Sequence, residues 1–386
     1  MKKSYELDMC NGPILGKILV FAIPLMISGI LQLLFNAADI IVVGRFTGSQ
    51  ALAAVGSTSA LINLIINLFI GVSVGANVVV ARNYGAKDYD GIHGAVHTSV
   101  LTAIWGGIIL IFVGILLARP MLEMMGTPED VIDLSVLYMR IYFVGMPAFM
   151  MYNFGAAILR AIGDTKRPLY FLTLSGVVNV VLNLFFVIVF HMGVAGVALA
   201  TIISQAISAF LIILCLMKMD GPCHLDFKHL KFHPEQLKSM LRIGLPAGLQ
   251  GAIFSISNVL IQSSVNSFGS QVMAGNPAAG NIEGFVYNSM NAVYQTSLSF
   301  TSQNMGARKY QNLNRVVLNC LLCAIVTGVV LGGGAVLAGT QLLHFYSSDA
   351  AVIAAGYERL RVICGTYLLC GIMDTLASSL RGLGYS

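Results

Sequence analysis

Charge is scarce in this chain, since Asp, Glu, Lys and Arg make up only 10% of its 386 residues. Soluble domains carry roughly 25% charged residues, so a soluble globular protein is excluded. Hydrophobic residues make up 57% of the chain, and the mean hydropathy is +0.82. The apolar runs exceed ~18 residues and lack strand-like alternation, which indicates membrane-spanning helices rather than barrel strands.

Signatures of enzymes are also missing. No HExxH motif, nucleophile elbow or Walker loop occurs, which argues against a membrane-embedded enzyme and against ATP as a driver. The seven cysteines are an odd number scattered mostly within apolar runs, so no disulfide framework is implied. The net charge of +5 comes from residues between the apolar runs, so we expect no nucleic-acid partner. Neither a metal site nor a cofactor is predicted.

The sequence instead contains ten apolar segments, which predict an all-α polytopic membrane protein. Gly71 and Gly75, and likewise Gly328 and Gly332, form GxxxG pairs that predict close helix contacts. The segments are residues 18–43, 52–79, 94–118, 134–159, 168–190, 194–217, 241–266, 281–302, 316–339 and 353–380.

The basic residues favour one topology. With a cytoplasmic N-terminus, 17 of the 22 Lys and Arg residues fall in inner loops or inner span ends, as the positive-inside rule requires. The outer loops carry acidic residues such as Glu123, Glu129 and Asp130 instead. The first apolar run is too long for a cleaved signal peptide, and we interpret it as a retained span.

The chain also contains an internal repeat with an offset of 221 residues. RNYGAKDY at 82–89 corresponds to QNMGARKY at 303–310, and LRAIGD at 159–164 corresponds to LRGLGY at 380–385. The repeat predicts two pseudo-symmetric helical-bundle lobes of the same orientation, and membrane transporters commonly place their site between such repeats. The predicted domains are a six-helix lobe at 1–217, a cytoplasmic linker at 218–240 and a four-helix lobe at 241–386.

The second lobe has two spans fewer than the first in this prediction. A symmetric protein would continue after the segment at 353–380, as the first copy continues after the matching segment at 134–159. The repeat therefore predicts that the chain lacks the last two helices.

Ionisable residues within spans are the first functional candidates, because each costs roughly 2.5–3.5 kcal/mol to insert. Of the 17 acidic residues, only Asp39, Glu283 and Asp374 fall clearly within spans. Gln32, Asn36 and Asp39 are spaced by four and three residues, which places them on one helix face.

Further polar residues are expected at the depth of Asp39. Asn179 and Asn183 are four residues apart in the fifth span, and Thr201 lies in the sixth. At ~1.5 Å per residue, Asp39, Asn183 and Thr201 lie roughly 8–12 Å below the outer surface. This common depth predicts a polar cavity in the first lobe. Two alternatives are ordinary interhelical hydrogen bonds of the Asn and Thr residues and an ion pair of Asp39 with Arg140.

The repeat separates candidates for ion coupling from residues that serve architecture. Asp39 corresponds to Leu260 and Asp374 to Asn153, and Glu283 has no acidic counterpart either, so each acid occurs in one copy only. We expect such unpaired acids to be functional. The candidates for a substrate cavity or a second-lobe polar site are Gln32, Asn36, Asn153, Glu283 and Asp374.

Pro24 lies within the first predicted span. A proline there frees a backbone carbonyl and permits a kink. We therefore predict a hinge in the helix that carries Asp39, with a tolerated membrane proline as the alternative.

The chain resembles the multidrug and toxic compound extrusion (MATE) family from about Ile14 to its last residue. The resemblance rests on ALAAVG at 51–56, GVSVGANVVVARNYGAKD at 71–88, LRAIGDTKRP at 159–168 and NVVLNLFFVIVFHMGVAGVALATIISQ at 179–205. It implies two six-helix lobes around a central cleft, and export of organic cations and amphipathic compounds in exchange for protons or sodium ions.

The resemblance also implies roles for particular residues. Asp39, Asn179, Asn183 and Thr201 match the first-lobe coupling site of the family, and Pro24 matches the proline at which the first span bends in some members. This chain departs from the pattern in two places. It carries Asn183 where many prokaryotic members have Asp, and its seventh span offers Gln250 but no acid. A complete second-lobe cation site is therefore not expected.

We accordingly expect a monomeric secondary multidrug antiporter in the bacterial cytoplasmic membrane. Its partners would be the lipid bilayer and small cationic or amphipathic compounds, and its driving ion a proton or sodium. The alternative is a flippase for a lipid-linked precursor with the same two-lobe plan. A flippase favours a cleft lined with Arg and Lys, and the predicted spans contain few of these residues.

Overall fold

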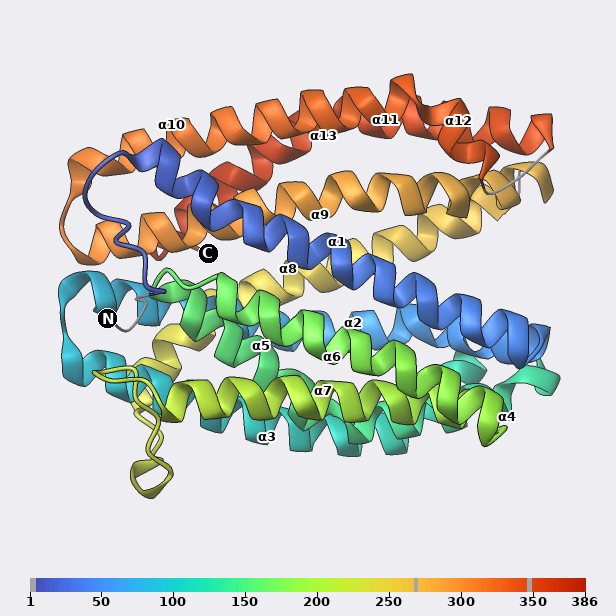
Figure 1. The fold of residues 1–386 in the computed structure, drawn as a ribbon, viewed down its shortest axis with the longest axis horizontal. Helices are drawn as coiled ribbons and strands as arrows, with labels where there is room; N and C mark the ends of the chain where they lie inside the picture. Colours follow the sequence, from blue (N-terminus) through green and yellow to red (C-terminus); the bar gives the residue numbers. More distant parts are fainter. Residues whose placement is uncertain (1–4, 267–269, 346–348) are drawn as a thin grey trace.

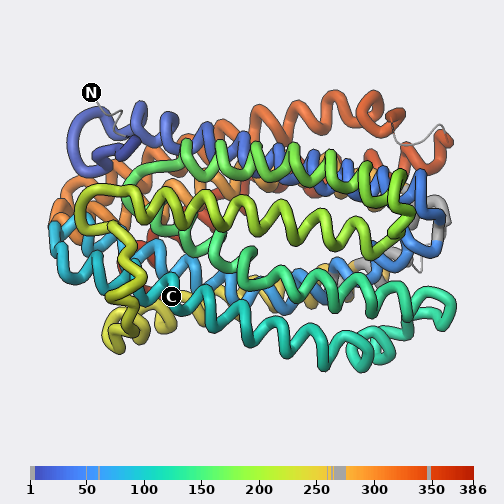
Figure 2. The backbone as a smooth tube through the Cα atoms, turned by 60° about the horizontal axis from the view of Figure 1, so that its bottom comes forward, coloured from blue at the N-terminus to red at the C-terminus, as the bar shows by residue number. Residues whose placement is uncertain are grey.

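The computed structural model describes residues 5–266, 270–345 and 349–386, and these residues form helices and loops without a strand. Figure 1 shows α1 crossing between two groups of helices, one from each half of the chain, and Figure 2 shows the same bundle turned by 60°. The first half contains α1 (Ile14–Phe46), α2 (Ser49–Ala86), α3 (Tyr89–Met124), α4 (Glu129–Val144), α5 (Met146–Ala161), α6 (Lys166–Leu184), the π-helix η1 (Phe185–Val189) and α7 (Gly193–Met217).

A short 3-10 helix, η2 (Phe227–His229), lies in the connection to the second half. The second half contains α8 (Pro234–Asn266), α9 (Ser270–Gly306), α10 (Tyr310–Thr327), the π-helix η3 (Gly328–Gly332), α11 (Gly333–Leu337), α12 (Gly339–His344) and α13 (Ala350–Leu383). The ten apolar segments predicted from the sequence all fall on these helices. The division into domains at 218–240 stays a prediction.

Seven helices in the described parts of the chain are long and apolar enough to cross a membrane, or eight if one bent pair is a single span. The predicted split into six plus four spans is therefore not confirmed. α9 is not among these helices, and many of its residues are polar. α9 directs side chains such as Thr296, Ser297, Ser299 and Asn304 into helix contacts, where they are buried.

The fourth predicted span differs from the sequence prediction, because it is broken. α4 ends at Val144, α5 begins at Met146, and the two are bent by 49° around Gly145. Pro147 lies in the first turn of α5, where its missing N–H costs no intrahelical hydrogen bond. The sequence contains this signal, although the prediction of an apolar segment at 134–159 did not use it.

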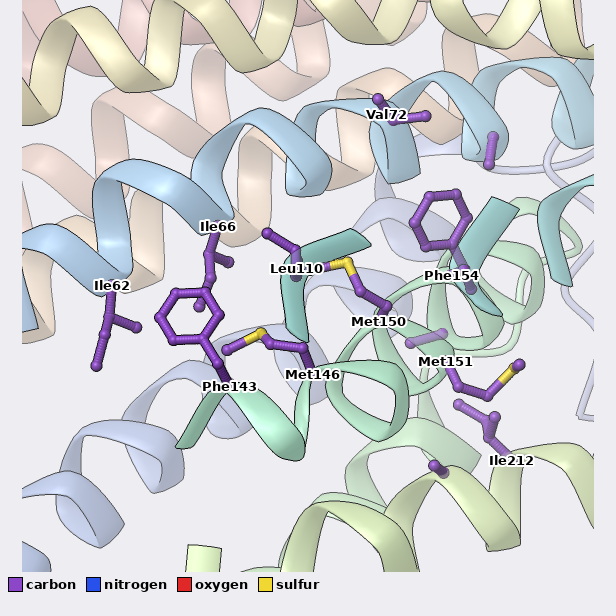
Figure 3. Packing of buried hydrophobic residues seen from close by; sticks show 14 of the residues in the cluster. Ile62, Ile66, Val72, Leu110, Phe143, Met146, Met150, Met151, Phe154 and Ile212 are labelled. Carbon is purple, nitrogen blue, oxygen red and sulfur yellow. The ribbon is translucent and has the colours of Figure 1, made fainter. Parts of the chain in front are cut away.

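The largest hydrophobic core lies among α2, α3, α4, α5 and α7. Figure 3 shows side chains from these five helices turned toward one another. Met146, Met150 and Met151 fill the space between Phe143 and Phe154, as unbranched thioether side chains do in irregular cores. This packing fixes α5 as the centre of the first half.

The two halves meet most closely where α2 packs along α8. A Cβ atom on Gly71 would lie 2.2 Å from the backbone nitrogen of Gly248, and one on Gly75 would lie 2.2 Å from the carbonyl oxygen of Met240. The contact predicted for the first GxxxG pair is thus confirmed, and its partner is the matching Gly244 and Gly248 of α8. The second GxxxG pair faces α13.

We predict that Gly71→Ala destabilises the protein by about 1–3 kcal/mol, because the added methyl group meets backbone that cannot yield. Gly56→Ala on the same helix is the matched control, since nothing lies within 4 Å of its Cβ position. Thermal unfolding of the purified protein in detergent measures the difference. Equal melting temperatures for the two variants would contradict the close packing of α2 against α8.

Candidate functional site

The predicted first-lobe site begins with the contact between α1 and α6. Gly176 lies so close to Phe35 that a Cβ atom there would overlap the phenyl ring. Because the two helices run in the same direction and touch at this point, residues one to two turns further along each helix also meet. Asp39 of α1 is thereby placed opposite Asn183 of α6.

Three of the predicted residues form one hydrogen-bonded cluster. The Asn183 Nδ2 donates to the Asp39 Oδ1, and also lies 3.3 Å from the Asn179 Oδ1. Asn183 is fully buried, Asn179 is 5% exposed, and Asp39 is partly exposed. The carboxylate therefore lies at the boundary between a buried amide pair and an accessible face.

The cluster has spare acceptor capacity. The Asn183 Oδ1 is buried and has no hydrogen-bond partner in the described chain, although an unpaired buried acceptor normally costs about 1–3 kcal/mol. The second Asp39 oxygen likewise accepts no hydrogen bond from any described residue. The two oxygens together offer a place for a proton or for a cation that prefers oxygen ligands.

The alternative of an Asp39–Arg140 ion pair is not supported. Arg140 of α4 is exposed, and among the described residues Asp39 forms no salt bridge. Tyr138 and Tyr142 of α4 instead lie within electrostatic range of the Asp39 carboxylate, without a hydrogen bond to it. The sequence analysis missed these two tyrosines, although their four-residue spacing on one helix face was a usable signal.

Thr201 is not part of the hydrogen-bonded cluster. Its Oγ1 donates to the Val197 carbonyl at 3.0 Å, within its own helix α7. Gln32 and Asn36 are exposed on α1 and do not join the cluster either. Common depth was therefore a sound guide to Asp39 and Asn183, but it did not predict which side chains touch.

The second-lobe candidates do not gather into one site. Glu283 of α9 forms a two-pronged ion pair with Arg359 of α13, at 2.5 Å from Nη2 to Oε1 and 3.2 Å from Nε to Oε2. Arg359 also donates to Asn276. Glu283 is therefore neutralised by a fixed guanidinium, which favours an architectural role over ion coupling.

Asp374 and Asn153 lie elsewhere. Asp374 is partly buried on α13, where the Cys370 Sγ donates to its Oδ2 at 3.9 Å. Asn153 donates to the Phe149 carbonyl at 2.8 Å in its own helix. Within the residues that the structure describes, no group of three or more His, Cys, Asp or Glu side chains is placed to hold a metal ion.

Comparison with known proteins gives a consistent family match. The MatE family model matches residues 24–185 and 246–386, which is more than half of the chain. The chain is 28% identical to the probable multidrug resistance protein YoeA of Bacillus subtilis (strain 168), over 95% of this chain and 80% of that protein. It is 27% identical to the probable multidrug resistance protein YpnP of the same organism, over 98% and 84%.

Solved structures agree with the fold. An outward-facing multidrug resistance MATE family transporter superposes with a TM-score of 0.92 at 24% identity, covering 100% of this chain and 86% of that chain. A MATE structure in the bent conformation gives a TM-score of 0.86 at 25% identity, covering 95% and 82%. These comparisons do not bear out the expectation that the last two helices are missing.

We predict that Asn183→Ala lowers the free energy of unfolding by about 1–3 kcal/mol, because the partly buried Asp39 carboxylate loses its hydrogen-bond donor. The matched control is Asn153→Ala, whose amide serves only its own helix, and we expect little change there. Denaturation in detergent measures both variants. A larger loss in the control would contradict the cluster as a source of stability.

Proposed function

The chain belongs to the MatE family, and from this premise we propose that it is a secondary multidrug efflux transporter. It would export amphipathic or cationic small molecules in exchange for protons or sodium ions. The observation that carries the proposal is the Asp39–Asn183–Asn179 cluster, a carboxylate without a charged partner among the described residues, placed against two buried amides.

The cluster supports coupling because it can exist in two charge states. When Asp39 is ionised, its second oxygen is free to attract a cationic compound. When a proton or a sodium ion occupies the same oxygens, the negative charge is cancelled and a cationic compound loses its attraction. An ion that enters from outside then displaces the cationic compound, because both compete for the single negative charge of Asp39.

Helix α1 is suited to respond to this change of charge. It runs without a break through Pro24, which is buried and leaves one backbone carbonyl without its usual donor. One turn further on, the Ser28 Oγ donates to the Pro24 carbonyl at 2.8 Å, a type of bond that often accompanies helix bending. We propose that bending here, with rocking of the two halves, alternates access.

Relatives from Bacillus and Staphylococcus support a bacterial membrane location, and a cytoplasmic N-terminus and a monomeric state are proposals. The relatives are multidrug transporters by name, so the flippase alternative is not favoured. They likewise give no support to an enzymatic activity.

We predict that Asp39→Asn reduces ethidium efflux from reconstituted vesicles to near background, because the amide cannot exchange a counter-charge. Asp133→Asn on the exposed side of α4 is the control and should transport normally. Imposing a pH gradient and a sodium gradient separately identifies the driving ion. Full activity of Asp39→Asn under both gradients would remove the mechanism.

We predict that Pro24→Ala binds ethidium as tightly as the unaltered protein but transports it several-fold more slowly, because an intact hydrogen-bond ladder stiffens α1. Pro120→Ala, in α3, serves as the control and should leave both quantities unchanged. Binding is measured by fluorescence anisotropy and transport by vesicle efflux. An unchanged rate in Pro24→Ala would refute the hinge.

A further inference from the structure

The connection between the two halves carries a surface segment that the proposed transport does not use. Residues 227–232 read FKHLKF, and we refer to them as the aromatic–basic segment. Phe227 is 46% exposed and Phe232 is 36% exposed, and Lys228 and Lys231 are exposed beside them. A segment that exposes both aromatic rings and lysines is typical of a membrane–water interface.

The leucines of this region are docked on the bundle. Leu225, two residues before the segment, is 1% exposed and belongs to the largest hydrophobic core. Its backbone N–H donates to the Leu216 carbonyl of α7 at 3.1 Å. Leu230, within the segment, packs against the same core. The two phenyl rings are therefore exposed on a fixed piece of chain, because the leucines before and between them are held inside.

Two backbone hydrogen bonds to α3 flank the segment. The Asp226 N–H donates to the Nε2 of His97 at 3.2 Å. The His233 N–H donates to the Oγ1 of Thr98 at 3.1 Å, and both α3 residues are fully buried. The His233 ring also lies against Gly94, where a Cβ atom would come 3.1 Å from it. Both ends of the segment are thus fixed on one helix, which gives its outer face a defined orientation.

The segment lies beside the bundle, at the end where α7 leaves the membrane. Figure 1 shows the yellow-green connection running sideways from the end of α7 instead of continuing along the helix axes, and Figure 2 shows it at the same end of the bundle. α7 is an apolar span that ends at Met217. A segment that extends sideways from this point lies over the surrounding lipid, at the level of the headgroups. This position favours a lipid partner over a water-soluble one.

The charge of the segment suits an anionic partner. From Phe227 to Pro234 the chain has two lysines and no acid. The adjacent acid, Asp226, is already engaged, because its Oδ2 accepts from the His229 Nδ1 at 2.6 Å and its Oδ1 from the Lys228 N–H at 2.9 Å. Basic residues gather at this end of the spans, which favours the cytoplasmic side, and that leaflet carries anionic lipids. Charge complementarity therefore favours an anionic headgroup over a zwitterionic one.

We propose that the aromatic–basic segment is a docking surface for anionic phospholipids. Lys228 and Lys231 bind the phosphate groups, and Phe227 and Phe232 lie among the glycerol groups and the first acyl carbons. This contact is independent of the proposed transport, because lipid binding needs neither a substrate nor an ion gradient.

Quenching of tryptophan fluorescence by brominated lipids tests the contact in reconstituted vesicles. Trp105 is the single tryptophan of the chain, so Trp105→Phe leaves a background without an indole. Adding Phe232→Trp to that background places one indole in the segment, and Phe227→Trp provides a second position. The vesicles mix phosphatidylcholine with phosphatidylglycerol, and one of the two lipids is brominated near the start of its acyl chains.

We expect brominated phosphatidylglycerol to be enriched around this indole at least about fivefold over its share of the bilayer, the factor expected for one lysine near the surface. Raising the ionic strength to about 0.5 M should weaken the preference, because salt screens exposed charges. Trp105 of the unaltered protein is 53% exposed on α3 and serves as the reference. It should be quenched equally by both lipids, because it contacts acyl chains rather than headgroups.

Charge variants in the same background separate a local contact from the effect of net charge. Lys228→Gln combined with Lys231→Gln should remove the preference for phosphatidylglycerol. Lys87→Gln combined with Lys238→Gln is the matched control, because it removes the same charge from two exposed lysines outside the segment. The control should keep the preference. Melting temperatures equal to that of the unaltered protein exclude misfolding as the cause of any loss.

Three results would overturn the proposal: no quenching of the segment by either lipid, equal quenching by both, or a preference that survives the loss of Lys228 and Lys231. The first would place the segment away from the membrane and leave its rings to a water-soluble partner. Ethidium efflux distinguishes these failures from failure of the proposed function. Efflux without a lipid preference refutes the docking surface only, whereas a lipid preference without efflux leaves the surface intact and refutes the transporter.

Discussion

Within a bilayer a polar group must find its partners in the protein, because no water is present to satisfy it. The Asp39 carboxylate meets this constraint with a single amide, the Nδ2 of Asn183. That contact exists only because Gly176 allows α6 to approach Phe35 of α1. The chemistry of the first half thus depends on a close backbone approach two helical turns away.

The two halves share a plan and differ in their polar chemistry. Glycines bring α2 against α8, whereas α1 meets α9 through larger groups, including an edge-to-face contact of Phe21 with Phe300. The first half places a carboxylate beside neutral amides. The second half uses guanidinium groups, one neutralised by Glu283 and one, Arg381, held by neutral acceptors. A duplicated scaffold can therefore carry unlike polar groups in its two halves, because interior side chains change without altering the backbone.

Much of the fold was predictable because hydropathy and helical periodicity are local properties. All ten apolar segments lie on helices, and the spacing of Asp39 with Asn36 and Gln32 was assigned to a helix. The break at Gly145 also has a local sequence signal, which is Pro147, but hydropathy does not reveal it because the surrounding residues form one apolar run. The six-plus-four division of spans failed to be confirmed for another reason. The polar residues of α9 lower its hydropathy, and only helix packing reveals that many of them are buried.

The sequence by itself determined the membrane class, the repeat and the scarce acids, since composition and spacing suffice for these. It also predicted Asp39, Asn179, Asn183 and Thr201 as a set. Only the tertiary structure decided that Thr201 bonds to its own helix and that Glu283 is locked by Arg359. It alone placed Arg381 against α8 and α9. The physical reason is that the contacts of Glu283 and Arg381 join residues more than seventy positions apart. Whether Thr201 faces a neighbouring helix likewise depends on the rotation and depth of whole helices, which local patterns do not encode.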